Sequence, residues 1–268
     1  MGTVHLEERE RVAWLRLDAE ARGNAVDRPL LERLEALLVA IAIRVAGGDP
    51  DAPRAAVLRG TGERSFCTGY NLEELVRELA AGPSVADEAQ HPLERALRAL
   101  DELPIPTLAL VHGHAYGAGC ELAVACDLRV AAEDARFCMP PARLGVLYSA
   151  SGMARFLDLV GLAATRDMFF TAEPVPAPRA LASGLATRVV PKAEATAEVA
   201  RLAGAIAKNA PLSVRGTKTI LRRLRRSPLA PDLQAEISGL REECFRSRDF
   251  AAAAQAFLSK TEVSFEGR

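Results

Sequence analysis

The sequence predicts an α/β protein in which buried strands alternate with helices. Two stretches repeat one order: a short apolar strand (55–58 and 107–111), a glycine-containing turn, and a helix (71–80 and 120–125). Another strand follows at 128–131, and this alternation is typical of an α/β core with crossover connections. The length of 268 residues suits one large domain, or one domain with an appended helical lobe.

The first elements follow from local patterns. Apolar residues flank the charged run 7–11, which predicts an opening β-hairpin with one buried face. A helix over 28–45 is predicted next, with Asp27 as its N-cap and Pro29 near its first turn. Its leucines and isoleucine recur every three or four residues, and Gly47 ends the pattern.

The remaining segments are a polar loop and a helical tail. Residues 81–92 contain glycine and two prolines without periodicity, which indicates a mobile loop that could act as a lid. After Pro191 the chain has no convincing strand. We therefore predict an α/β core over 1–190 and a helical region over 191–268 that serves assembly. The predicted helices of this region are 194–209, 212–226, 233–246 and 249–258.

Composition excludes several classes of function. Thirty-four basic and 35 acidic residues leave a net charge of -1, so neither nucleic acid nor anionic lipid is an expected partner. The basic stretch 215–226 is interpreted as an amphipathic helix with a solvated face, since it lacks aromatic residues for base stacking. No export signal or membrane-length apolar run is visible, and five cysteines without a CxxC pair predict a reduced, cytoplasmic protein.

Two glycine turns carry the candidate chemistry. In segment 111–121, a helix that begins near Ala118 would direct free N–H groups towards an anion, with Glu121 on its first turn. Segment 65–72 likewise places backbone donors before a helix, and two converging donors make an oxyanion hole. A tight turn with a glutamate that complements the helix dipole explains the same residues, so spacing alone leaves both interpretations open.

Histidines do not point to a metal. His112 and His114 lie near Cys120 and Glu121, but their spacing matches no zinc pattern, and we expect no metal. His91, in the predicted loop, is interpreted as a solvated histidine outside the site.

Three segments, SFCTGYNL (65–72), PIPTLALVHGHAYGAGCELAVACDLRVAAEDARF (104–137) and ALASGLATRVV (180–190), together resemble the enoyl-CoA hydratase/isomerase (crotonase) superfamily. The resemblance runs nearly end to end. It implies a spiral of ββα units and a C-terminal helical region used in homotrimers, often paired into hexamers. It also implies acyl-CoA substrates, with no cofactor besides the coenzyme A of the substrate.

The resemblance also assigns residues to roles. By motif position, the backbone N–H groups of Thr68 and Ala118 would hold the thioester oxygen while an enolate develops. Thr68, Gly69, Tyr70 and Asn71 would line the CoA channel. Lys260 matches a lysine that reaches a CoA phosphate from a neighbouring subunit.

Departures from the family pattern suggest the type of reaction. Hydratases that resemble the chain carry a glutamate matched by Glu121 and a second one where Pro141 stands here. Hydration needs water activated at one carbon and a proton delivered to its neighbour, and two carboxyl groups usually share this work. The absence of the second carboxyl group therefore disfavours hydration. Ser149 stands where dehalogenase-like relatives carry a nucleophilic aspartate. Tyr148 follows Pro141 by seven residues, as in the methylmalonyl-CoA decarboxylase branch.

The sequence therefore favours a lyase that decarboxylates a malonyl-type acyl-CoA, with Glu121 and Tyr148 as catalytic residues. An oxyanion hole gives such a reaction its main assistance. Two alternatives stay open: a hydratase/isomerase with non-standard catalytic residues, and a non-catalytic acyl-CoA-binding protein. A third concerns Tyr148 alone, which could pack a loop with its hydroxyl bonded to the backbone.

Overall fold

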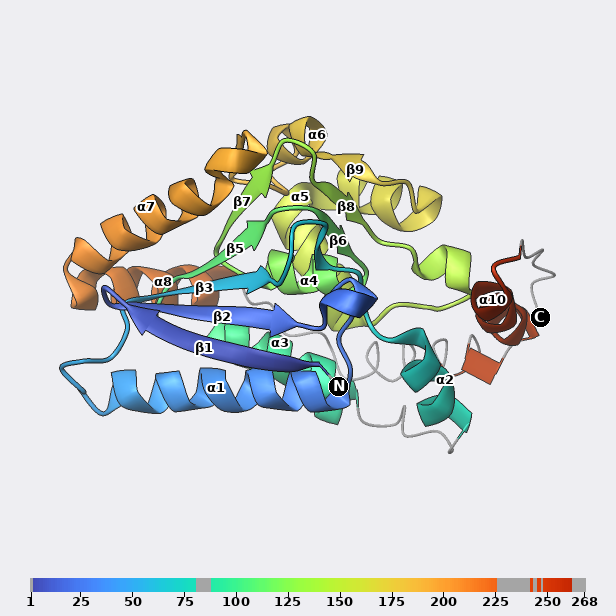
Figure 1. Cartoon of the computed structure of the whole chain (residues 1–268), viewed down its shortest axis with the longest axis horizontal. Helices are drawn as coiled ribbons and strands as arrows, with labels where there is room; N and C mark the ends of the chain where they lie inside the picture. Colours follow the sequence, from blue (N-terminus) through green and yellow to red (C-terminus); the bar gives the residue numbers. More distant parts are fainter. Residues whose placement is uncertain (1, 81–87, 226–241, 243–244, 247, 262–268) are drawn as a thin grey trace.

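The computed structural model contains two sheets surrounded by helices (Figure 1). It describes residues 2–80, 88–225, 242, 245–246 and 248–261. The six-stranded sheet has the order β1-β2-β3-β5-β7-β10. Its strands are β1 (Thr3–Arg9), β2 (Val12–Asp18), β3 (Ala55–Gly60), β5 (Thr107–Val111), β7 (Leu128–Ala132) and β10 (Arg188–Val190). The smaller sheet consists of β4 (Ser65–Cys67), β6 (His114–Tyr116), β8 (Arg136–Cys138) and β9 (Val175–Pro176).

The chain winds as a spiral of ββα units. Strands β3, β5 and β7 lie parallel in the larger sheet, and each is followed by a parallel strand of the smaller sheet. Helices α2 (Leu72–Ala80), α4 (Ala118–Ala125) and α5 (Ala150–Thr171) then return the chain. The α/β class and the ββα spiral are confirmed. Strands β4 and β6 lie inside the segments expected to be turns, because three residues are too few to show a periodic pattern.

The opening hairpin forms as predicted, with one difference in burial. Its two-residue turn, Glu10 and Arg11, has φ angles of 51° and 63°, which matches the twist of a tight hairpin. Strand β1 exposes most of its residues. Strand β2, however, is buried on both faces, because it also pairs in parallel with β3 and helices cover the sheet.

Helix α1 (Arg28–Ala46) starts where its cap predicts. The Asp27 carboxylate accepts a hydrogen bond from the Leu30 N–H at 3.1 Å, and Gly47 follows the last residue. Helix α4 begins at Ala118, as expected for segment 111–121 and two residues before the apolar helical stretch that starts at 120. The other helices are α2 (Leu72–Ala80), α3 (Pro92–Glu102), α4 (Ala118–Ala125), α5 (Ala150–Thr171), α6 (Ala177–Ala182), α7 (Ala195–Lys208), α8 (Pro211–Arg225) and α10 (Arg248–Ser259).

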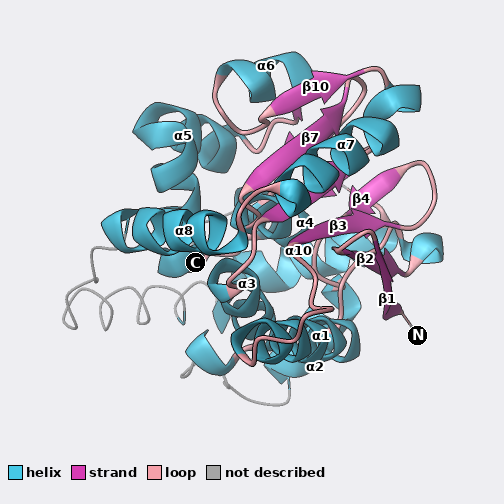
Figure 2. Ribbon diagram, turned by 90° about the vertical axis from the view of Figure 1, so that its left-hand side faces the viewer, coloured by secondary structure: helices cyan, strands magenta, loops and turns pink. Residues whose placement is uncertain are grey.

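Helices cover the larger sheet on both faces. Helix α7 packs against β3, β5 and β7, and α1 packs against β1 and α3 (Figures 1 and 2). Helix α10 contacts the short 3-10 helix η4 (Pro141–Leu144). Helices α7, α8 and α10 confirm three of the four predicted in the tail. Most of the fourth, 233–246, lies outside the described residues, as do residues 81–87 of the loop predicted over 81–92. The described end of that segment differs from the prediction, because Glu88–Gln90 forms a short 3-10 helix and Pro92 begins α3.

Two further expectations concern cysteines and membranes. Cys67, Cys120, Cys126 and Cys138 are free thiols and buried, as predicted, whereas Cys244 lies outside the described residues. Within the described part of the chain, no helix combines the length and apolar character that crossing a bilayer requires.

Candidate active site

The two glycine turns open into the same cavity, which has a volume of about 430 Å³. The first turn contributes Thr68, Gly69 and Tyr70, and the second contributes Gly117 and Ala118. Most of the remaining wall is apolar and comes from α2, the start of α3, η4 with the segment that follows it, and the C-terminal region. These apolar residues are Leu72, Leu75, Leu93, Pro140, Pro141, Leu144, Val146, Leu147, Phe245 and Phe257. The predicted pairing of the two turns is therefore present.

The second turn presents the start of α4 to the cavity. Gly117 has φ 51° and ψ -122°, a conformation that glycine tolerates, and no side chain caps the helix. A Cβ atom on Gly119 would lie 2.1 Å from the Cys67 carbonyl oxygen, so only glycine allows α4 to approach β4 this closely. The Ala118 N–H, at the first helical position, lies where the helix dipole favours negative charge.

The first turn differs from the prediction at Thr68. The Thr68 N–H donates to the Gly23 carbonyl at 3.1 Å, so this amide is already used and does not fit the role expected for it. The backbone that approaches Ala118 is that of Gly69, whose ideal Cβ position lies 3.8 Å from the Ala118 nitrogen. The Gly69 carbonyl accepts from Val26 at 2.8 Å, and in a trans peptide the N–H of Tyr70 points to the opposite side.

Glu121 and Tyr148 meet at the cavity. Glu121 lies on the first turn of α4 with 1% of its surface exposed, and its Oε2 accepts a hydrogen bond from the Tyr148 hydroxyl. Tyr148 also packs edge-on against Phe169, with 5.7 Å between ring centroids. The Tyr148 hydroxyl thus bonds a buried carboxylate, which excludes the alternative of a bond to the backbone.

An arginine links a second carboxylate to Glu121. Arg155 on α5 donates from Nη1 to Glu121 Oε1 at 2.8 Å. The same guanidinium holds Glu94 of α3, from Nη2 to Oε1 at 2.6 Å and from Nη1 to Oε2 at 3.1 Å. Glu94 lines the cavity beside Glu121. Four side chains from distant parts of the sequence therefore form one hydrogen-bonded network.

Burial shifts the proton affinities of this network. It raises the pKa of Glu121, although the Arg155 charge and the Tyr148 hydrogen bond oppose the shift. It also raises the pKa of Tyr148 well above its usual value, and the neighbouring Glu121 acts in the same direction. For Arg155, burial alone would lower the pKa, but the bonds to the two carboxylates outweigh it and raise the pKa. Tyr148 thus stays protonated at neutral pH.

Two positions that separate family members have clear structural roles. Pro141 starts η4 and lines the cavity, so no carboxylate stands at that point of the wall. Ser149 caps α5, because its Oγ accepts from the Gly152 N–H at 3.0 Å. Pro141 therefore brings no carboxyl group to the cavity, and neither residue is an aspartate or a glutamate.

Comparison with known proteins decides the family. Residues 7–268 match the family model described as enoyl-CoA hydratase/isomerase. The chain belongs to the enoyl-CoA hydratase/isomerase, or crotonase, family.

Individual relatives of this crotonase-family chain have different names. It is 32% identical over 270 residues to the 2,3-dehydroadipyl-CoA hydratase of Escherichia coli (strain K12), covering 100% of both chains. It is 29% identical to the short-chain-enoyl-CoA hydratase of Clostridium acetobutylicum, covering 98% of this chain and 97% of the relative. A solved structure of methylmalonyl-CoA decarboxylase with 2-nitronate-propionyl-CoA superposes with a TM-score of 0.89, at 27% identity and 99% coverage of both chains.

Three residues of this crotonase site were missed from the sequence. Glu94 and Arg155 lie on helices without a motif, and only tertiary packing brings them to Glu121. His91, interpreted as a solvated histidine, lines the cavity with its ring centroid 5.5 Å from that of Tyr70. Its Nδ1 also caps α3 by accepting from the Leu93 N–H. A histidine followed by proline at a helix start was the one local signal available.

Two predicted binding residues lie away from this cavity. The side chain of Asn71 caps α2, with its Oδ1 accepting from the Glu73 and Glu74 N–H groups at 3.0 and 3.3 Å. Lys260 is exposed, has a φ of 55°, and does not line the cavity of its own chain. Among the side chains that the structure describes, no group of three or more His, Cys, Asp or Glu could hold a metal ion.

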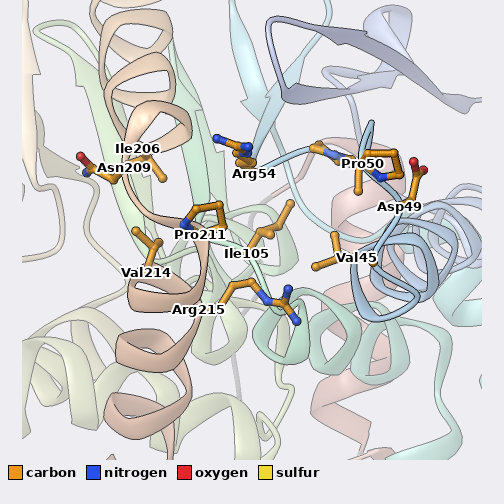
Figure 3. A pocket seen from close by; sticks show the side chains of 13 residues that line it. Val45, Asp49, Pro50, Arg54, Ile105, Ile206, Asn209, Pro211, Val214 and Arg215 are labelled. Atoms are coloured by element: carbon orange, nitrogen blue, oxygen red, sulfur yellow. The ribbon is translucent and has the colours of Figure 1, made fainter.

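A second hollow of about 170 Å³ lies outside this crotonase site (Figure 3). It is formed by the end of α1, the segment that follows it, and the junction of α7 and α8. Arg54 and Arg215 lie on two sides of it, and Arg54 donates to the Ala207 carbonyl at 3.1 Å. None of the predicted site residues lines this hollow, so the chemistry belongs to the larger cavity.

Proposed function

We propose that the chain is a lyase that removes CO₂ from a malonyl-type acyl thioester of coenzyme A. The observation that carries this proposal is the Tyr148–Glu121 hydrogen bond, located in the cavity that contains the start of α4. It provides a protonated group beside a backbone site for negative charge. The structural similarity to methylmalonyl-CoA decarboxylase supports the same reaction.

The first step requires stabilisation of an enolate. When the bond to the carboxylate carbon breaks, CO₂ leaves and its bonding electrons pass into the enolate, whose charge rests on the thioester oxygen. The N–H groups of Ala118 and Tyr70 would hold that oxygen, because both lie on backbone that faces the cavity. The apolar wall would disfavour the substrate's carboxylate and so promote its loss.

The second step is protonation of the enolate carbon. Tyr148 would deliver the proton of its hydroxyl to the enolate carbon, so that the thioester carbonyl forms again. A proton taken up from solvent and passed on by the Glu121 carboxyl would then restore the phenol. The raised pKa of Glu121, caused by burial, lets this carboxyl carry a proton at higher pH than an exposed glutamate. The reaction consumes one proton and releases an acyl thioester and CO₂. No cofactor besides coenzyme A is required.

A neighbouring hollow suits a phosphate-bearing carrier. It has a volume of about 320 Å³ and shares Thr68 with the main cavity. Arg22 and Arg64 line it together with one acidic residue, Glu20. These two guanidinium groups would attract the phosphates of coenzyme A, and Thr68 to Tyr70 would line the path between the hollows.

Hydration is the second candidate function. The names of several relatives favour it, and a second carboxylate, Glu94, does line the cavity. Glu94 is bound by both terminal nitrogens of Arg155, however, which leaves it poorly placed to activate water. A protein that binds acyl-CoA without converting it is the third alternative.

One product assay distinguishes these functions. The purified protein is incubated separately with malonyl-CoA, methylmalonyl-CoA and crotonyl-CoA, and the thioester mass is measured over time. We expect loss of CO₂ from a malonyl-type substrate and no efficient addition of water to crotonyl-CoA. Efficient hydration of crotonyl-CoA would contradict the proposal, and binding of all three without turnover would indicate a non-catalytic protein.

Assembly into trimers, or pairs of trimers, remains part of the proposal. Large apolar side chains on α5 and α8 are exposed in the isolated chain, as expected for surfaces that another copy covers. They are Leu157, Leu162, Phe170, Leu212, Ile220 and Leu221. Lys260 would then serve a neighbouring subunit's substrate. Sedimentation equilibrium tests the assembly, and a monomer at micromolar concentration would contradict it.

A further inference from the structure

One arginine joins two carboxylates that come from different helices. Arg155 binds Glu94 of α3 and Glu121 of α4, and its side chain is 13% exposed. The Glu94 side chain is 16% exposed and that of Glu121 is 1% exposed. Such pairs are screened weakly by solvent, so each charge strongly affects its neighbours. Two negative groups share one positive group, and one negative charge is left unbalanced.

The hydrogen bonds give the three residues different tasks. Both oxygens of Glu94 accept from Arg155, and Oε2 also lies 3.2 Å from the Ser151 hydroxyl. Glu94 is therefore held in place and not free to exchange protons with substrate. Glu121 divides its oxygens, with Oε1 towards Arg155 and Oε2 towards Tyr148. Arg155 thus fixes the rotation of the carboxyl that faces Tyr148.

We propose that Glu94 and Arg155 are positioning residues, which orient the Glu121 carboxyl and set how readily it exchanges a proton with Tyr148. Arg155 favours the charged carboxylate, and Glu94 limits this effect by competing for the guanidinium. The inference rests on the proposed function only for the identity of the reaction, because the network itself exists without substrate.

The proposal predicts opposite effects for the two residues. Replacing Arg155 removes the positive charge beside Glu121 and leaves Glu94 as a negative neighbour, so Glu121 should hold its proton to higher pH. Replacing Glu94 by glutamine leaves Arg155 to Glu121 alone, so Glu121 should release its proton at lower pH. A purely structural ion pair would give lower stability in both variants and leave kcat unchanged.

The other titratable groups around Glu121 are consistent with opposite effects of Arg155 and Glu94 on its pKa. Arg155 on α5, Tyr148 before α5 and Glu94 on α3 are the groups that act on its carboxyl from neighbouring helices. Among the described residues, strands β4 and β6 and helix α4 add thiols, a phenol and the imidazole of His114. Burial raises the pKa values of the thiols and the phenol and lowers the pKa of His114, so all of them stay uncharged at neutral pH. The thiols and the phenol are those of Cys67, Cys120 and Tyr116.

The test measures Glu121 directly in the full-length protein without substrate. Infrared difference spectra between wild type and Glu121→Gln identify its carboxyl band, which is then followed against pH in Glu94→Gln, Arg155→Gln and Arg155→Lys. Arg95→Gln is the matched control, because Arg95 lies on α3 and binds Glu35 at 2.6 Å in a pair that does not touch Glu121.

We expect the pH midpoint of the Glu121 carboxyl titration to rise in Arg155→Gln and to fall in Glu94→Gln. It should stay near the wild-type value in Arg155→Lys and Arg95→Gln. Unchanged midpoints, or shifts in the same direction for Glu94→Gln and the Arg155 variant, would overturn the proposal. If Arg155→Gln does not fold, Glu94→Gln alone decides, since an upward or absent shift contradicts the competition for Arg155.

Activity provides a second, separate readout. With any substrate that the product assay shows to be converted, we expect roughly 100-fold lower kcat in Arg155→Gln, little change in KM, and partial recovery in Arg155→Lys. Unchanged kcat with shifted midpoints would reject the positioning role while leaving the lyase proposal intact. The reverse case, opposite midpoint shifts in a protein that converts no substrate, would reject the lyase proposal alone.

Discussion

The two walls of the active-site cavity differ in which part of the chain forms them. One wall is main chain, formed by the Gly69 turn and the start of α4 at Ala118. The other is a side-chain network of Tyr148, Arg155 and Glu94 around Glu121. The first is fixed by close backbone contacts that glycines permit, whereas the second depends on the charge of each member. Substitutions should therefore affect stability at the first wall and proton transfer at the second.

Adding a methyl group to the main-chain wall should have the largest effect. In Gly119→Ala the new Cβ would meet the Cys67 carbonyl at 2.1 Å, so α4 must move away from β4. We expect a loss of roughly 3 kcal/mol in the free energy of unfolding, together with most of the activity. Denaturant unfolding measures the first effect. In the control Gly204→Ala, on α7, the added Cβ has no neighbour within 4 Å, and stability should not fall.

The side-chain wall should respond through the reaction rate. Tyr148→Phe removes the hydroxyl that Glu121 binds and keeps the ring against Phe169. We expect about 100-fold lower kcat, with a smaller change in KM, because the proton donor is lost and the acyl pocket remains. Steady-state kinetics with the decarboxylated substrate measures both. A variant with full kcat would remove Tyr148 from the reaction.

A milder change at the first turn should sharpen the contrast. Gly69 has φ +111°, and a Cβ there would lie 3.1 Å from the Tyr116 carbonyl oxygen, beside Ala118. Gly69→Ala should lose about 1–3 kcal/mol of stability and also lower kcat/KM. Gly48→Ala also adds a side chain at a positive φ, +72°, but with open space around its Cβ, and should lose stability alone. Equal loss of kcat/KM in both variants would contradict the main-chain role.

The smallest expected effect concerns the thiols behind the main-chain wall. Burial raises the pKa of Cys67 to about 12, and this thiol is 0% exposed. Because the thiolate is the reactive form, we expect Cys67 to resist iodoacetamide at pH 8 until the protein unfolds. Peptide mass mapping after labelling measures this. Rapid labelling of Cys67 in the native protein would show that the wall opens frequently.

The sequence predicted more of the main-chain wall than of the side-chain wall. The α/β class, the cap of α1 and the helix near Ala118 follow from local patterns of glycine, capping and apolar residues, and all are present. The ββα spiral followed only from the family resemblance, because the short strands β4 and β6 lie in segments expected to be turns. The expected role of the Thr68 amide failed because its partner, Gly23, lies 45 residues earlier in the chain. Glu94 and Arg155 were missed for a similar reason, since helix packing brings charged residues together without a local signature.

The central claim is that two backbone amides hold the thioester oxygen as it becomes negative. A crystal structure with 2-nitronate-propionyl-CoA, the compound bound in the solved methylmalonyl-CoA decarboxylase, tests it most directly. The oxygen that corresponds to the thioester carbonyl should lie within hydrogen-bond distance of the Ala118 and Tyr70 nitrogens, with the nitronate near the Tyr148 hydroxyl. An oxygen bound elsewhere, or a cavity that excludes the acyl group, would contradict the account.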